Sequence, residues 1–158
     1  NTGAQKSSST PQYARTGSTP AGKLSRKKDL TGIMAAHNVP YAATASAGHV
    51  ADLRRKLAKA RAMRGFRMLT LLIPCLDGWG VADDAGLTAA LLAVETGAFP
   101  LYEVEDGTRW TLNSKKTRPI GDYLAVQRRY RNTDPERVAA LQAGVDETWA
   151  RLERLAAA

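Results

Sequence analysis

The chain has 158 residues, 44% of them hydrophobic, which is sufficient for one globular domain with a buried core. Its single cysteine excludes an internal disulfide framework and is typical of a reducing compartment, so we expect a cytoplasmic protein. No apolar stretch is long enough to span a bilayer and no signal peptide is visible. Because the first residue is Asn1 rather than methionine, we expect the chain to begin within a longer protein.

The net charge of +8 is concentrated in the first part of the chain. Residues 1–70 contain 13 Lys and Arg against two acidic residues, whereas the remainder contains 10 against 13. Such asymmetry indicates a surface for nucleic acid or for an acidic partner. Tyr13 and Tyr41 are not interleaved with the basic runs, as a base-stacking platform would require, so a solvated face or an acidic protein partner is favoured.

Residues 1–28 show no hydrophobic periodicity. They are rich in Ser, Thr and Gly, with Pro11 and Pro20 between, and this composition favours a flexible linker. The same residues also suit an ordered loop whose backbone N–H groups, hydroxyls and cations surround a diphosphate. Both interpretations stay open from composition.

Regular structure is predicted from residue 29 onward. We expect helices over 29–37, 49–64, 84–96, 120–130 and from 133 toward 155, and strands over 40–46, 66–73, 99–104 and 109–112. Strand and helix alternate, which predicts an α/β fold with a parallel sheet and a helical C-terminal extension. Asp106 and Gly107 predict a hairpin turn, and Thr133 with Glu136 predicts a capping box for the last helix.

The helix expected over 49–64 is strongly basic. Its apolar stripe is formed by Val50, Leu53, Leu57 and Ala60. Its basic residues, which are predicted to lie in solvent, are Arg54, Arg55, Lys56, Lys59 and Arg61.

The segment FRMLTLLIPCLDGWG, residues 66–80, is the candidate functional stretch. Its apolar run is typical of a strand buried on both faces of a parallel sheet, and Pro74 ends that strand. Cys75 then lies at the carboxyl end of the strand, where open α/β sheets bind their ligands. From the residues alone, Cys75 is either a small buried hydrophobe or a catalytic thiol that needs His37 or His49.

Six segments follow one another in an order known from one protein family. They are NTGAQKSSSTP, TPAGK, KKDL, IMAAHNVPYAATAS, LLIPCLDGWG and LAVETGAFPLYEVEDG, between Asn1 and about Tyr130. The chain thereby resembles the carboxyl-terminal half of the thiamine-diphosphate-binding β subunit of 2-oxoacid:ferredoxin oxidoreductases, in the pyruvate and 2-ketoisovalerate group. The resemblance implies an incomplete parallel-sheet thiamine-diphosphate-binding fold. It divides the chain into an active-site loop over 1–28, a βαβ part over 29–113 and a helical tail over 114–158.

The resemblance also assigns the candidate site residues. It implies that Asn1, Thr2 and Gly3 lie beside thiamine diphosphate, with Asn1 as a catalytic group near the substrate. It makes Cys75 the last of four thiolate ligands of a 4Fe–4S cluster. The other three cysteines and the ligands of Mg²⁺ are expected upstream, so these 158 residues would be a fragment without activity of its own.

The implied reaction is the oxidative decarboxylation of pyruvate, or of a related 2-oxoacid, to acyl-CoA. Coenzyme A is the second substrate, ferredoxin accepts the electrons, and other subunits complete a hetero-oligomer. The basic helix over 49–64 would then attract the acidic ferredoxin. The alternative is a non-catalytic basic module that binds an acidic protein or nucleic acid; we expect no membrane partner.

Overall fold

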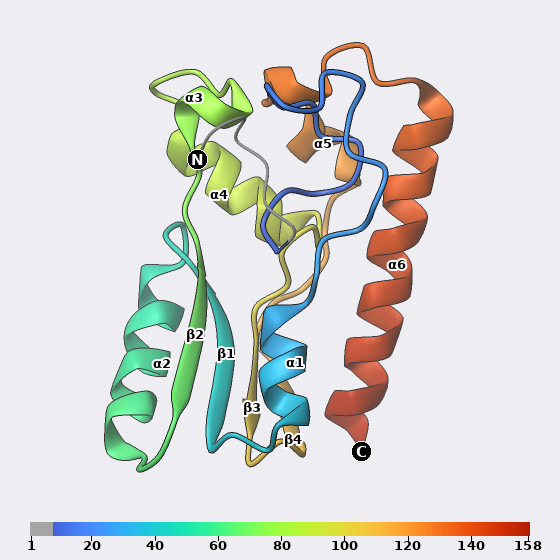
Figure 1. Ribbon diagram of the computed structural model, residues 1–158. Helices are drawn as coiled ribbons and strands as arrows, with labels where there is room; N and C mark the ends of the chain where they lie inside the picture. Colours follow the sequence, from blue (N-terminus) through green and yellow to red (C-terminus); the bar gives the residue numbers. More distant parts are fainter. Residues whose placement is uncertain (1–7) are drawn as a thin grey trace.

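The computed structural model describes residues 8–158, so Asn1, Thr2 and Gly3 lie outside the described part. Four strands form one mixed sheet in the order β2-β1-β3-β4 (Figure 1). The strands are β1 (Tyr41–Ser46), β2 (Arg67–Leu72), β3 (Tyr102–Glu105) and β4 (Arg109–Leu112). β1 pairs in parallel with β2, whereas the β1–β3 and β3–β4 pairs are antiparallel. The α/β class is confirmed, and one strand pair is parallel.

Helices cover both faces of this sheet. They are α1 (Leu30–Ala36), α2 (Val50–Ala62), α3 (Leu76–Trp79), α4 (Gly86–Glu95), α5 (Ile120–Ala125), the 3₁₀ helix η2 (Arg128–Tyr130) and α6 (Pro135–Ala157). Leu69 of β2 packs with Ala60 of α2, whereas the next residue, Thr70, hydrogen-bonds Thr31 of α1 at 2.8 Å. Since adjacent strand residues point to opposite faces, α1 and α2 cover opposite faces. None of the helices in residues 8–158 has the length and apolar character needed to cross a membrane.

α6 closes the face that α1 also covers (Figure 1). Leu152 of α6 is buried in one cluster with Ala35 of α1 and with Tyr102 and Val104 of β3. The helix begins differently from the prediction, because Asp134 is the N-cap and accepts a hydrogen bond from the Arg137 N–H at 2.8 Å. The predicted capping box is therefore wrong: the Thr133 hydroxyl donates instead to the Tyr130 carbonyl, at 2.7 Å.

The loop over residues 8–28 packs against the helical tail. The Arg15 N–H donates to the Arg129 carbonyl at 3.1 Å, and Ala14 is fully buried in the main core. Lys23 is buried as well, and its ammonium donates to the Thr10 carbonyl at 2.8 Å. The flexible-linker interpretation is therefore wrong for residues 8–28, which form an ordered loop.

β2 is an edge strand of the sheet formed by residues 8–158. Its flanking residues Phe66 and Ile73 are 58% and 63% exposed, and Leu71 is exposed too. The prediction of a strand buried on both faces is therefore wrong within this chain. A central strand needs two neighbours, and among the described residues β2 has β1 alone.

The basic face predicted for α2 is largely paired inside the fold. Lys56 is fully buried, and its ammonium donates to the Thr44 carbonyl and to Asp52, both at 2.8 Å. Arg55 binds buried Glu103 at 2.8 Å, and Lys59 lies 3.4 Å from the same carboxylate. The prediction of solvent exposure is therefore wrong for Lys56, and Lys59 is only partly exposed, whereas Arg55 is exposed as expected even though it is paired. Arg54 and Arg61 are exposed, as expected.

Glu103 is the centre of this buried charge cluster. Its carboxylate also accepts a hydrogen bond of 2.5 Å from the Tyr41 hydroxyl. Burial acts to raise the pKa of Glu103, but the hydrogen bonds from Tyr41 and Arg55 and the charge of Lys59 outweigh it and hold that pKa below its usual value. Glu103 is therefore ionised, and it neutralises the inner side of α2.

Candidate functional site

Cys75 begins a helical turn at the carboxyl edge of the sheet. Pro74 separates it from β2, and the thiol is exposed. Cys75 is the N-cap of α3, and its Sγ accepts a hydrogen bond of 3.3 Å from the Gly78 N–H. This position at the end of a strand confirms the expectation from sequence, but the expected loop is a short helix. An exposed sulfur with one N–H donor is suited to bind a metal or a ligand.

Gly80 ends this helical turn in the left-handed conformation, with φ of +64°. The turn then contacts η2, since the Gly80 carbonyl accepts a hydrogen bond of 3.2 Å from the Arg128 N–H. A Cβ on Gly80 would lie 2.6 Å from the Cβ of Arg128. Gly80 is therefore a turn residue and a site of close approach, whereas the Gly78 N–H is the one directed at sulfur.

η2 exists because the helix predicted over 120–130 is interrupted. Gln127 is buried, and its side-chain amide donates to the Tyr123 carbonyl at 2.6 Å near the end of α5. Its Oε1 accepts a hydrogen bond of 2.8 Å from Arg129 Nε. The prediction of one continuous helix is wrong, because this buried amide replaces the helical hydrogen bonds and turns the chain toward α3.

The Arg129 side chain joins η2 to α3. Its guanidinium carbon is 4.3 Å from the centroid of the Trp79 ring, and the Trp79 ring meets the Tyr123 ring edge to face, with centroids 6.4 Å apart. Burial lowers the pKa of Arg129, and the neighbouring Tyr130, Tyr123 and Cys75 groups offset part of that change. Sequence reasoning missed Arg129, although the run RRYR after α5 was a visible signal.

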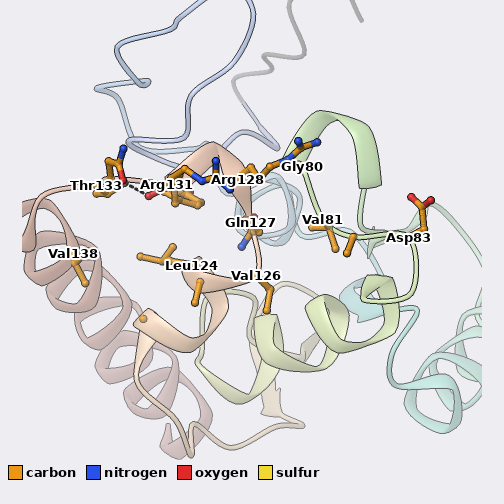
Figure 2. A pocket seen from close by; sticks show the side chains of 15 residues that line it. Gly80, Val81, Asp83, Leu124, Val126, Gln127, Arg128, Arg131, Thr133 and Val138 are labelled. Carbon is orange, nitrogen blue, oxygen red and sulfur yellow. Dashed lines mark hydrogen bonds between the residues drawn. The ribbon is translucent and has the colours of Figure 1, made fainter.

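Two cavities adjoin this contact between α3 and η2. The first has a volume of about 750 Å³ and lies between the Gly80 turn, α5, η2 and the start of α6 (Figure 2). Arg128 lies next to Gly80 in Figure 2, and Arg131 and Asp83 also line this cavity. The second has a volume of about 470 Å³ and lies beneath the loop over 8–28, with Trp79 and Arg129 in its lining. The α3 turn is thus accessible from more than one side.

The histidines give no support for a thiol enzyme. His37 ends α1 ahead of β1, and hence lies at the sheet edge opposite to Cys75. His49 precedes α2 at the same edge as Cys75, but its buried Nδ1 has no hydrogen-bond partner in the described part of the chain. No hydrogen bond among residues 8–158 joins Cys75 to either histidine.

Cys75 is one possible ligand and not a complete metal site. Among residues 8–158, no group of three or more His, Cys, Asp and Glu side chains could hold a metal ion. A 4Fe–4S cluster takes four thiolates. The residues present fit one corner of such a cluster, through an exposed Sγ and the Gly78 N–H directed at it, and the other three thiolates would come from another polypeptide segment.

Comparison with known proteins shows the family to which this chain is related. The chain is a homologue of the β subunits of 2-oxoacid:ferredoxin oxidoreductases, which confirms the family expected from its motifs. It spans about half the length of the curated relatives it matches. No family model matches the chain.

Three relatives illustrate the similarity. Pyruvate synthase subunit PorB of Methanocaldococcus jannaschii is 44% identical over 153 residues, which cover 93% of this chain and 51% of that subunit. Ketoisovalerate oxidoreductase subunit VorB of Pyrococcus horikoshii is 42% identical over 165 residues, covering 99% of this chain and 53% of that subunit. Pyruvate synthase subunit PorB of Methanothermobacter marburgensis is 43% identical over 152 residues, covering 92% of this chain and 53% of that subunit.

Proposed function

We propose that this chain is part of the β subunit of a cytoplasmic, hetero-oligomeric 2-oxoacid:ferredoxin oxidoreductase. In the proposed reaction a 2-oxoacid and coenzyme A give acyl-CoA and carbon dioxide, and two electrons pass one at a time to ferredoxin. Homology to PorB and VorB over nearly the whole chain supports this reaction class. The names of these relatives favour pyruvate or a branched-chain 2-oxoacid as the substrate.

The observation that supports the proposal most directly is the placement of Cys75. We assign its Sγ as one of the four thiolates of a 4Fe–4S cluster, because it is exposed at a strand end and the Gly78 N–H already points at it. Hydrogen bonds to cluster sulfurs are among the factors that set a reduction potential. When bound, the cluster supplies a one-electron acceptor. The Trp79 and Gly80 contacts with η2 fix the turn that presents the thiolate.

Thiamine diphosphate with Mg²⁺ is the second cofactor of the proposal, and when bound it supplies an electron sink for decarboxylation. Asn1, Thr2 and Gly3 would lie beside it, and the Asn1 amide would orient the substrate and donate to a developing oxyanion. The ordered loop over 8–28, which follows this segment, packs on η2 and would hold it near the Cys75 turn. The ligands of Mg²⁺ belong to another segment of the subunit.

The test is the cluster content of the complete oxidoreductase that contains this chain. Cys75→Ala should remove or convert one 4Fe–4S cluster, and therefore lower iron and acid-labile sulfide by up to about four atoms each per β subunit. Thiamine diphosphate binding should stay the same. Asp77→Asn is the matched control, since Asp77 lies on the same exposed turn and should keep full iron content. Unchanged iron and normal electron transfer in Cys75→Ala would overturn the assignment.

A further inference from the structure

Arg129 is a buried cation without a matching acid. The residue is buried, with 7% of its surface exposed to solvent. Among residues 8–158, its Nη2 has no hydrogen-bond partner, although Nε donates to Gln127, and no salt bridge of this part of the chain involves Arg129. Buried charges in proteins are normally paired, because removing a charge from water without compensation is costly. The guanidinium has polar and aromatic neighbours but no acidic partner among residues 8–158, which indicates an anion that is bound from outside the described residues.

The Cys75 turn is the place where that anion would lie. The guanidinium stacks on the Trp79 ring, and the Trp79 backbone N–H donates to the Cys75 backbone carbonyl at 3.0 Å, so one helical turn separates Trp79 from Cys75. The groups that raise the pKa of Arg129 are the Tyr130 and Tyr123 phenols and the Cys75 thiol, and no carboxylate is among them.

A cluster held by four thiolates carries net negative charge, which increases by one when the cluster is reduced. A fixed cation beside it favours the reduced state, and this effect is large where water is excluded. Net charge and burial are among the factors that set cluster potentials. Arg129 is fixed by Gln127 and by Trp79, so it can provide this charge without rearrangement.

We propose that Arg129 is the buried counter-charge of the redox group bound at Cys75, and that it raises the reduction potential of that group. The inference rests on the proposed function. It makes Arg129 a positioning residue that acts through electrostatics and does not ligate the iron.

The experiment is an EPR-monitored reductive titration of the complete oxidoreductase with three variants of this chain. Arg129→Gln removes the charge, and Arg129→Lys keeps it. Arg128→Gln is the matched control, because Arg128 is the neighbouring residue of the same 3₁₀ helix but is exposed to solvent. We expect Arg129→Gln to disfavour reduction of the cluster about tenfold, which lowers its midpoint potential by about 59 mV for one electron. Arg129→Lys and Arg128→Gln should shift the equilibrium less than about twofold.

The variants also separate charge from packing. Loss of the cluster in Arg129→Gln with retention in Arg129→Lys would support the inference, because those two variants differ in charge. Three outcomes would overturn it. They are loss of the cluster in both Arg129 variants, equal midpoint potentials in Arg129→Gln and Arg128→Gln, and equal shifts of the potential in Arg129→Gln and Arg129→Lys. The iron content of Cys75→Ala, measured in parallel, distinguishes failure of this inference from failure of the proposed function: a cluster that survives loss of Cys75 refutes the function itself.

Discussion

Replacing Gly80 with alanine tests the contact that joins α3 to η2. Gly80 has φ of +64°, and a non-glycine residue in the left-handed region costs about 1–2 kcal/mol. The new Cβ would lie 2.6 Å from Arg128 Cβ and 2.8 Å from Arg128 Nε. The Nε can move away, but the Cβ is fixed to the backbone of η2, so the two segments must separate.

We estimate the whole effect from these two contributions. Overpacking of this kind costs about 1–3 kcal/mol, which with the backbone strain gives a loss of about 2–5 kcal/mol in the free energy of unfolding. Gly121→Ala is the matched control, because it makes the same chemical change in α5, where a Cβ meets nothing within 4 Å. Alanine is the better helix former, so the control should gain up to about 1 kcal/mol.

Urea unfolding of the 158-residue chain, followed by far-UV circular dichroism, measures both variants. We expect a lower midpoint for Gly80→Ala and an equal or higher midpoint for Gly121→Ala, with similar slopes. Equal midpoints for Gly80→Ala and the wild type would refute the argument that the Cys75 turn is fixed against η2.

Two further predictions concern the buried charge cluster and the cofactor segment. Glu103→Gln should lower stability at pH 7 by about 1–3 kcal/mol, because Tyr41, Arg55 and Lys59 lose a charged partner. The folded-state pKa of Glu103 is lowered, so its stabilising contribution is complete above its unfolded pKa of about 4.3 and is lost as the pH falls through the folded value. The free energy of unfolding, measured with urea between pH 7 and pH 3, should therefore fall less steeply with decreasing pH in the variant. The same pH dependence in the variant and the wild type would contradict this role. Asn1→Ala in the complete oxidoreductase should lower turnover about 10²-fold, with cofactor affinity nearly unchanged, and wild-type turnover would remove Asn1 from the site.

Local signals in the sequence were sufficient for most of the secondary structure. The helix predicted over 49–64 is α2, and the predicted strands at 40–46 and 66–73 are β1 and β2, with bounds that differ by one or two residues. The hairpin is present as well, with Asp106 and Gly107 at φ of +50° and +71°. Hydrophobic periodicity, helix caps and turn residues depend on residues only a few positions apart, so they can be recognised in a single sequence.

Burial depended on neighbours that a single segment does not specify. The apolar composition of β2 indicates a central strand, but its second neighbour is not among residues 8–158. Lys56 looks like a surface lysine, yet the Thr44 carbonyl and Asp52 satisfy its ammonium in the interior. These partners come together through tertiary packing, which overrides the usual preference of lysine for solvent.

The same distinction applies to the candidate site, of which the local part could be predicted from the sequence and the tertiary part could not. The position of Cys75 at a strand end followed from the apolar run and Pro74. The role of η2 did not, because the break after α5 depends on the side chain of Gln127, which hydrogen-bonds Tyr123 and Arg129. Helix propensity favours one continuous helix there, and a buried amide decides against it.

The most direct test of whether Cys75 binds an iron–sulfur cluster is the anomalous scattering of iron in crystals of the complete oxidoreductase. Data collected on both sides of the iron K edge locate every iron atom independently of any assumed ligand. We predict iron bonded to the Sγ of Cys75, within a cluster that three cysteines from outside this chain complete. A free, ordered Cys75 thiol, in crystals whose iron lies elsewhere, would contradict the account.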